Sequence, residues 1–282
     1  MVKPETRERV KEREEDCMNI VERMQKGEKI SIGMVHTLPL PGSFHGGYTL
    51  EEVMQRAVFD AKTLEQGGFD ALIVENVNDG PFLPEGISTR QLVSLALITQ
   101  KVREAVDIAV GIDVCGRQSA GIEVASLLKG VDFIRLSSLV DVRIGADGIS
   151  QPNGAEAVWL RKLIGAEHVK ILADIQVKHT FALQESIAIE DSAVWAVTTG
   201  CDALIVTGLS TGLETSVETM RRVKKVSAVP VIAGSGVSPK NVKEQYEVCD
   251  GAIIGSCLKK EGNLLNPIDV SLAAEFIRKA KQ

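Results

Sequence analysis

The chain has 282 residues, of which 44% are hydrophobic, and its formal net charge at pH 7 is −6. Chains of this length commonly fold as one large α/β domain, so we predict a single domain over residues 1–282. The acidic balance disfavours a general nucleic-acid binder, which would need a basic face, but it allows a local basic pocket for a phosphorylated small molecule. No apolar run reaches the ~18 residues of a membrane helix, so no membrane span is predicted.

The first 29 residues are highly charged and lack the apolar core of a secretion signal. We predict that residues 1–29 form an amphipathic helical extension that covers the bottom of the fold or a subunit contact. No two cysteines form a C-x-x-C pair, which favours free thiols in a cytoplasmic protein. Of these thiols, Cys115 is of most interest because it follows a predicted strand end.

Four segments repeat one phrase, in which a turn residue and an Asp precede a short apolar run. They are Gly68–Asn76, Gly130–Ser138, Gly200–Gly208 and Val248–Ser256. The runs are too short for helices and apolar on both faces, as in the covered strands of a parallel sheet. Four more strand-like runs lie between them, at Ile30–His36, Ile108–Val114, Val169–Asp174 and Pro230–Gly234. Together they predict eight strands.

Helical patterns separate these strands. They cover Leu50–Gln66, Thr89–Ala105, Ser119–Leu128, Ala155–Ile164, Glu185–Thr199, Thr215–Val226, Pro239–Glu247 and Asp269–Lys281. Eight strands that alternate with eight helices predict an α/β fold, a (β/α)8 TIM barrel with an extra N-terminal helix. A doubly wound open sheet is the main rival. It is disfavoured because no G-x-G-x-x-G opens a helix after the first strand.

The repeated Asp opens its strand directly after a helix-ending turn. Asp70, Asp132, Asp202 and Asp250 therefore belong to the N-terminal end of the predicted barrel. Residues at that end stabilise such a fold, whereas its chemistry occurs at the other end. We predict a structural role for all four.

Polar or small residues stand at all eight predicted C-terminal strand ends, where barrel active sites lie. They are His36, Glu75, Asn76, Asp113, Arg135, Asp174, Thr207, Gly208, Gly234, Ser235, Gly236, Gly255 and Ser256. We expect Asn76, Arg135 and the residues from Thr207 onward to bind a substrate.

The last two strand ends predict a phosphate site. Glycine lets the backbone approach an anion closely, and the Ser235 and Ser256 hydroxyls are donors. Barrels often bind phosphate in the loops after strands seven and eight. Lys259 is expected to add a positive charge, and the Gly-rich segment 207–212 is expected to face the same side. The alternative is that these small residues only allow tight turns.

The other strand ends supply acid and base groups. His36 is a candidate general acid or base because its ordinary pKa is near neutrality. Glu75, Asp113 and Asp174 are candidate catalytic carboxylates, and Lys178 with His179 follows Asp174 closely. A Schiff base at Lys178 would need a desolvated amine, which the sequence does not indicate.

No cofactor is predicted from the sequence. A divalent metal held by Glu75, Asp113 or Asp174 is compatible with the polar ring, but no H-E-x-x-H or clustered Cys/His spacing supports it. The expected ligand is a phosphorylated small molecule, and a homo-oligomer is compatible with this fold.

Several of these segments resemble the signatures of the BtpA/SgcQ family. The motifs, in order, are GMVHTLPLPGS, GGFDALIVENVNDGPF, ADIQVKHT, DALIVTGLSTG, IAGSGVSPKN and DGAIIGSCLKKEG, and the resemblance runs from about Ile30 to Asp269. It implies a ribulose-phosphate-binding-like barrel. Cyanobacterial members are linked to accumulation of photosystem I reaction-centre proteins, and SgcQ-type members to sugar-metabolism gene clusters.

Two segments depart from that family's usual pattern. After the third strand the family tends to read G-x-N-x-L-x-N-D, whereas this chain reads Gly111 to Gln118 as GIDVCGRQ. After the fourth strand, Arg135–Ser138 stands where Arg-Val-Asn is usual. The departures imply a substrate or activity that differs from those of typical members.

Two functions fit these observations. The first is an enzyme that acts on a small phosphorylated sugar or related metabolite, as an isomerase, epimerase or aldol-type lyase. A remote phosphate anchor would supply binding energy for proton transfer at the reacting carbon. The second is a non-catalytic assembly or metabolite-sensing factor, for which the charged residues 4–26 are the candidate partner surface.

Overall fold

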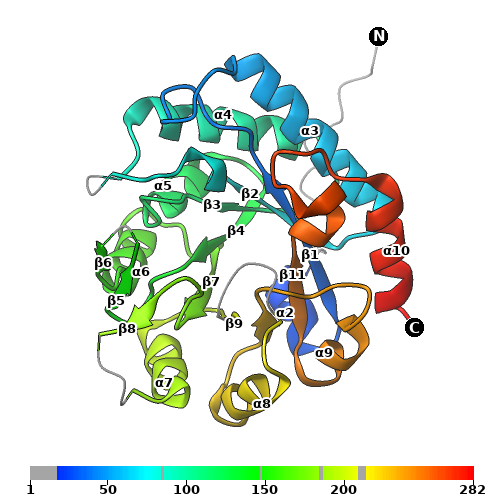
Figure 1. Cartoon of the computed structure of the whole chain (residues 1–282). Helices are drawn as coiled ribbons and strands as arrows, with labels where there is room; N and C mark the ends of the chain where they lie inside the picture. The colour runs from blue at the N-terminus through cyan, green and yellow to red at the C-terminus, as the bar shows by residue number, and fades with distance from the viewer. Residues whose placement is uncertain (1–17, 84–85, 147, 184–186, 209–213) are drawn as a thin grey trace, which may run out of the picture.

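Eight parallel strands close into a barrel (Figure 1). In the computed structural model, the described residues are 18–282 without 84–85, 147, 184–186 and 209–213. The barrel strands are, in ring order, β1 (Ile30–His36), β2 (Ala71–Glu75), β3 (Ala109–Asp113), β4 (Val131–Leu136), β7 (Lys170–Ile175), β9 (Ala203–Val206), β10 (Val231–Ala233) and β11 (Gly251–Ile254). The predicted (β/α)8 TIM barrel is confirmed.

Helices surround the ring of strands (Figure 1). They are α3 (Leu50–Gly67), α4 (Thr89–Ala105), α5 (Ala120–Leu127), α6 (Gly154–Leu163), α7 (Ile189–Thr199), α8 (Val217–Val226), α9 (Val242–Val248) and α10 (Val270–Ala280). The local sequence determines where several of these helices begin and end. Thr49 and Glu52 form a capping box that starts α3, and Gly68 ends it in the left-handed conformation at φ 88°.

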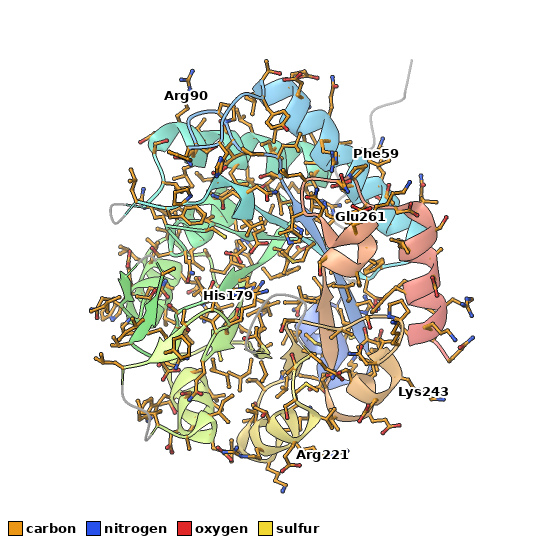
Figure 2. All side chains as sticks on the ribbon, viewed as in Figure 1. Phe59, Arg90, His179, Arg221, Lys243 and Glu261 are labelled. Carbon is orange, nitrogen blue, oxygen red and sulfur yellow. The ribbon has the colours of Figure 1, made fainter. Side chains whose placement is uncertain are left out.

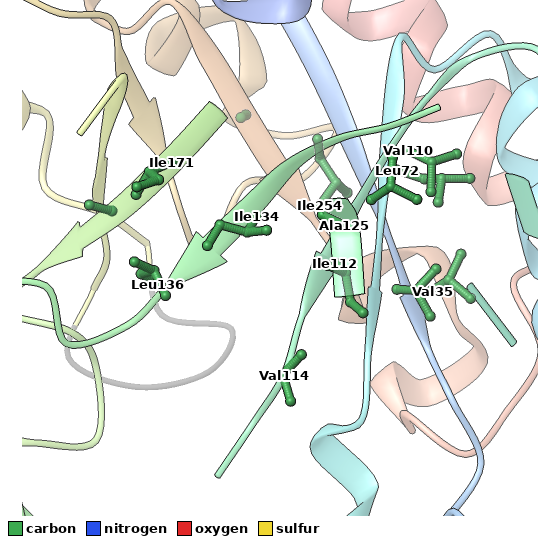
Figure 3. Close-up of a cluster of buried hydrophobic side chains, with 14 of the residues drawn as sticks. Val35, Leu72, Val110, Ile112, Val114, Ala125, Ile134, Leu136, Ile171 and Ile254 are labelled. Carbon is green, nitrogen blue, oxygen red and sulfur yellow. The ribbon is translucent and has the colours of Figure 1, made fainter. Parts of the chain in front are cut away.

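Apolar packing occurs on both sides of the strands. Outward-facing residues of the strands pack against the helices, and Figure 3 shows part of this layer, in which Leu72, Ile134, Ile171 and Ala125 of α5 are labelled. Inward-facing residues fill the barrel, among them Ile32, Ile73, Phe133, Leu172, Ala203, Ile205, Ile232 and Ile253. Strands buried on both faces explain the continuous apolar runs of the sequence.

The N-terminal extension contributes to the inner cluster. Helix α2 (Ile20–Gln25) begins at a capping box of Asn19 and Glu22, and its Ile20, Val21 and Met24 pack onto the apolar residues inside the barrel. This part of residues 1–29 therefore covers the bottom of the barrel, as predicted. Residues 1–17, which include most of the predicted helix, lie outside the described residues.

Every second residue of each strand faces the inside of the barrel, and this alternation continues to the C-terminal ends of the strands. Met34, Ile73, Phe133, Leu172, Ile205, Ile232 and Ile253 point inward. Two residues after each stand His36, Glu75, Arg135, Asp174, Thr207, Gly234 and Gly255, and Asp113 follows Ala109 and Gly111 in the same phase. The predicted polar ring is thus the uppermost inward layer.

The repeated Asp residues bind neighbouring strands, as predicted for a structural role. Asp70 accepts from the Ser31 amide at 2.9 Å and Asp202 from the Ile171 amide at 2.8 Å. Asp250 accepts from the Val231 amide at 2.8 Å, and Asp132 is hydrogen-bonded to the Val110 backbone. The second, fourth, sixth and eighth barrel strands are β2, β4, β9 and β11. The Asp at the start of each is therefore hydrogen-bonded to the barrel strand that precedes it in the sequence.

A small antiparallel sheet was not predicted from the sequence. It contains β5 (Arg143–Gly145), β6 (Gly148–Ser150) and β8 (Phe181–Ala182), in the order β6-β5-β8. Arg143 joins its parts, because its guanidinium donates to the Thr180 hydroxyl at 3.0 Å and to the Thr180 carbonyl at 3.1 Å. The sheet links the loops that follow β4 and β7.

No helix in the described part of the chain is long and apolar enough to cross a lipid bilayer. The expectation of no membrane span therefore holds for those residues.

Replacing Asp202 tests the strand-joining role of the repeated Asp. Its carboxylate also accepts from Arg161 at 2.7 Å, so Asp202→Ala leaves the Ile171 amide without its acceptor and removes the carboxylate partner of this guanidinium. We expect unfolding free energy to fall by about 2 kcal/mol in urea titration. The control is Glu275→Ala on the exposed side of α10, which should change it by less than about 0.5 kcal/mol. Equal losses in the two variants would contradict the role.

Candidate active site

A pocket of about 310 Å³ opens at the C-terminal end of the barrel. Ten of the predicted site residues line it: His36, Glu75, Arg135, Lys178, His179, Gly234, Ser235, Gly236, Gly255 and Ser256. In Figure 2, His179 lies toward the middle of the molecule, whereas Arg90, Arg221 and Lys243 lie at its edge. Most of the predicted ring therefore borders one space.

His36 and Glu75 form a buried pair on adjacent strands. They are register partners of β1 and β2, and His36 Nε2 lies 3.2 Å from Glu75 Oε2. Burial acts to raise the pKa of Glu75, but the hydrogen bond from His36 and the positive charges of His36, Arg135 and Lys178 outweigh it and lower the pKa to about 2. Glu75 is therefore ionised at neutral pH.

The pKa of Asp113 is shifted in the opposite direction. It is the register partner of Glu75 on β3, is 1% exposed and is hydrogen-bonded to Glu75. Burial, followed by the negative charge of Glu75, raises the pKa of Asp113 well above its ordinary value, although Arg135 acts against the shift. The pKa values of two adjacent carboxyl groups are thus moved in opposite directions, which is the arrangement that separates an acid from a base.

Arg135 and Asp174 form the buried ion pair of this layer. Arg135 Nε donates to Asp174 Oδ2 at 2.8 Å, and a second guanidinium nitrogen donates to Oδ1 at 3.0 Å. Both carboxylate oxygens of Asp174 are therefore engaged. Asp174 is 2% exposed and is not among the residues that line the pocket, whereas Arg135 borders it.

Lys178 brings a second cation to the pocket. Burial and then repulsion by Arg135 lower the pKa of the Lys178 amine, although Glu75, Asp174 and Asp113 oppose the shift. The Lys178 amide donates to the Thr207 hydroxyl at 2.8 Å, so Thr207 holds this loop. Gln176 and His179 on either side have positive φ angles of 47° and 61°, a conformation that costs energy for residues with a side chain.

The glycine-rich side of the pocket comes from the loops after β10 and β11. Ser235 accepts from the Gly208 amide at 2.7 Å, and Asn241 donates to the Gly236 carbonyl at 3.0 Å. Gly255 leaves room for the His36 ring, because a Cβ there would lie 2.8 Å from His36 Cε1. Segment 207–212 was expected to face this side; its residues 209–212 lie outside the described residues.

Other predicted residues lie away from the pocket surface. Asn76 is fully buried, accepts from the Cys115 amide at 2.8 Å and donates to Asp79 at 3.0 Å. Asp113, Asp174, Thr207 and Gly208 also lie outside the set that borders the pocket.

Lys259 does not contribute charge to the anion site, contrary to expectation. Its amine is fully buried on the helix side of the barrel, where it contacts Asp60 at 3.4 Å and donates to the carbonyls of Leu264 and Asn266. The sequence placed Lys259 three residues after Ser256, but the short helix η2 (Ser256–Leu258) turns its side chain away from the pocket.

Cys115 was noted in the sequence only for following a strand, yet it joins the carboxylate pair. Its Sγ lies 3.7 Å from Glu75 Oε1, and the donor atoms of Glu75, Asp113 and Cys115 lie within 4.8 Å of one another. Burial and the negative charges of Asp113 and Glu75 raise the pKa of this thiol. A residue spacing of two, Asp113 to Cys115, was the signal that both side chains share one face.

Fold and site together define a (β/α)8-barrel protein with buried acid and base groups beneath a pocket at the C-terminal end of its strands. The sequence profile of the BtpA family matches residues 27–282. The chain therefore belongs to the BtpA family.

Known proteins agree with this assignment. An uncharacterized protein of Methanocaldococcus jannaschii is 34% identical over 90% of this chain and 96% of its own length. The photosystem I biogenesis protein BtpA of Synechocystis is 32% identical over 87% of this chain and 86% of its own. Among solved structures, (S)-3-O-geranylgeranylglyceryl phosphate synthase of Thermoplasma acidophilum, in complex with sn-glycerol-1-phosphate, matches with a TM-score of 0.61. It shares 15% identity over 94% of this chain and 99% of that one, a likeness of fold.

Separating Arg135 from Asp174 tests the buried pair. Asp174→Ala leaves a buried guanidinium without its partner and should lower the unfolding free energy by about 3–5 kcal/mol. The double variant Arg135→Met/Asp174→Leu removes both charges at similar volume, so it should recover most of that loss. Urea titration of the wild type, Arg135→Met, Asp174→Leu and the double variant gives the coupling free energy. A double variant as unstable as Asp174→Ala would contradict the pairing.

Asp113→Asn tests the protonated carboxyl group. The raised pKa means that the folded protein binds the Asp113 proton more tightly than the unfolded chain does. Stability from this group is therefore complete below the unfolded pKa and decreases as pH rises toward the folded value. Asn stays neutral and removes that decrease. In chelator-containing buffer, Asp113→Asn should raise Tm more at pH 8 than at pH 5, and an equal difference at both pH values would contradict the assignment.

Proposed function

We propose that the protein is an enzyme that acts on a small phosphorylated sugar or related metabolite. One observation carries the proposal: a single pocket has acid, base and ammonium groups on one side and a Gly/Ser loop pair on the other. The reaction would be of the isomerase, epimerase or aldol-type lyase class, since each requires proton transfer near a carbonyl group.

The glycine-rich side supports the phosphate half of the proposal. Among the described residues, the amides of Gly236 and Val237 donate no hydrogen bond within the protein. Both residues border the pocket, and Gly236 has the positive φ angle of 68° that turns the backbone there. Amide groups and serine hydroxyls are donors that suit a phosphate group, and a sugar phosphate of a few carbons matches the pocket volume.

The charged side supports the chemical half. His36, held by Glu75 at 3.2 Å and bordering the pocket, is the candidate general acid or base. Asp113 lies beside Glu75 and is hydrogen-bonded to it, which keeps the Glu75 carboxylate in place. Arg135 and Lys178 would stabilise negative charge on a substrate oxygen, because both cations border the pocket.

A covalent adduct at Lys178 would distinguish an aldol-type lyase from an isomerase or epimerase. The desolvated amine of Lys178 is the feature that the sequence did not indicate, and it suits a Schiff base with a carbonyl substrate. An aldol-type lyase of this kind would form a covalent adduct at Lys178 that borohydride reduces to a stable amine. An isomerase or epimerase would turn over without such an adduct. Mass spectrometry after reduction distinguishes the two.

Adding a negative charge to the Gly/Ser loops after β10 and β11 tests phosphate binding. Ser256→Asp adds a carboxylate to the pocket rim, and Ser235→Asp adds one from the other loop. Sugar phosphates of three to six carbons should raise the Tm of the wild type, and each substitution should abolish the shift. Ser271→Asp in the exposed first turn of α10 is the control and should keep it. The proposal fails if no phosphorylated sugar shifts Tm, or if both pocket variants respond as the wild type does.

The second candidate is a non-catalytic assembly factor. Its specific support is an apolar surface over α6 and α7, where Trp159 is 76% exposed, Leu163 is 81% exposed and Trp195 is 48% exposed. Exposed aromatic side chains are common where proteins bind one another. The charged residues 4–26 are less suitable over their described part, since Ile20, Val21 and Met24 are buried. A Trp159→Glu variant that keeps all ligand responses but loses function in cells would favour this candidate.

A further inference from the structure

The strongest unexplained group of side chains lies at the floor of the pocket. Glu75 ends β2, Asp113 ends β3 at the same level, and Cys115 follows two residues later. Each offers one donor atom, and these atoms lie within 4.8 Å of one another. Acid–base chemistry on a substrate gives no role to the thiol.

A buried acceptor in this cluster lacks a partner. Asp113 is 1% exposed, and its Oδ1 accepts no hydrogen bond from any described residue. Buried polar atoms are nearly always satisfied, because an unsatisfied one costs about 1–3 kcal/mol. Oδ1 belongs to the carboxyl group that faces Glu75 and Cys115, so the missing partner belongs in the same cluster.

The nearby cations do not supply that partner. Arg135 directs two nitrogens to Asp174, at 2.8 and 3.0 Å, and its Nε is 3.9 Å from Asp113 Oδ2. The same pairing removes Asp174 from the metal ligands that the sequence allowed, since both of its oxygens are engaged. Glu75, Asp113 and Cys115 remain.

A second layer of hydrogen bonds holds these three residues in place. His36 Nε2 contacts Glu75 Oε2 at 3.2 Å. Asn76 accepts from the Cys115 amide at 2.8 Å, and its own amide donates to Asp79, which also accepts from Gln91 at 3.0 Å. Outer hydrogen bonds of this kind orient the ligands of protein metal sites. They also give the buried Asn76 a positioning role.

We propose that Glu75, Asp113 and Cys115 bind one divalent transition-metal ion, with zinc as the best match. Two carboxylates and a thiolate suit zinc, cobalt or ferrous iron, whereas magnesium and calcium prefer oxygen ligands alone. Of the three residues, Glu75 borders the pocket. The ion therefore lies at the pocket floor with its open coordination position toward the space above, as in catalytic sites. The inference goes beyond the proposed function and does not rest on it.

Cobalt titration of the chelator-treated full-length protein tests the site without any substrate. The wild type should bind one Co²⁺ with a thiolate-to-cobalt charge-transfer band. Cys115→Ser should lose that band, and Cys115→Ser and Asp113→Asn should each weaken binding by at least about 100-fold. Asn76→Ala should keep the band and weaken binding about 10- to 100-fold, because it removes only the support of Cys115.

Cys201→Ser is the matched control. Cys201 is a buried thiol at the start of β9, near the opposite end of the barrel, so its loss should leave both the band and the affinity unchanged. Absence of a charge-transfer band in the wild type, or a band that persists in Cys115→Ser, overturns the proposal.

Alkylation of the wild-type protein tests the metal site without depending on whether a variant folds. Cys115 and Cys257 are both free cysteines in partly exposed residues, so peptide mass spectrometry can follow the two together. Saturating Zn²⁺ should slow alkylation of Cys115 at least about tenfold and leave Cys257 unchanged. An unchanged rate at Cys115 overturns the proposal. When the sugar-phosphate thermal shifts are measured with chelator added, neither result bears on them, so the two proposals can fail separately.

Discussion

Closure of a parallel sheet constrains everything else in this molecule, because it directs every second residue of eight strands into one narrow space. The lower part of that space holds Ile, Ala and Phe side chains, which gain free energy when they leave water. The top layer holds charged groups instead. Such groups lose hydration on burial, so they persist only when paired. Arg135 with Asp174 and His36 with Glu75 meet that condition.

Strand register determines which pairs form. His36, Glu75 and Asp113 end neighbouring strands at one level, so the order of the strands around the barrel sets the order of charges. Volume is a second constraint. The Phe133 ring occupies the space beside Gly111, where a Cβ would lie 2.3 Å from it, and the His36 ring fills the space beside Gly255. Two of the inward-facing glycines therefore serve packing inside the barrel, and this explains Gly255 without any ligand.

The sequence was sufficient for the barrel because its apolar runs, turn residues and helix caps all indicate the same fold. β1 and α4 begin and end at the predicted residues. The small sheet β5-β6-β8 was missed because strands of two or three residues in loops have no periodic pattern. The direction of the Lys259 side chain depends on a single turn of helix η2, which spacing along the chain cannot give.

The sequence could predict which residues border the candidate site, because these residues stand at the C-terminal ends of strands. Ten of the expected residues border the pocket, since the alternation of a strand fixes which way its last side chain points. Partners were not predictable. That Asp174 binds Arg135, and that Asn76 holds Cys115, follows from contacts between residues 39 positions apart in the sequence. The segment Gly111–Gln118 was noted for departing from the family pattern, and two residues of that segment, Asp113 and Cys115, complete the cluster at the pocket floor.

Large charged side chains and small residues are segregated around the barrel. The strands β1, β2, β3, β4 and β7 end in or lead to His36, Glu75, Asp113, Arg135, Asp174 and Lys178, whereas β10 and β11 end in glycine and serine. In the proposed reaction, the anionic end of the ligand would lie at the small residues and its other end at the charged groups. Binding energy gained at the anion is then available to position the distant carbon, which is how a fixed anchor contributes to rate rather than to affinity alone.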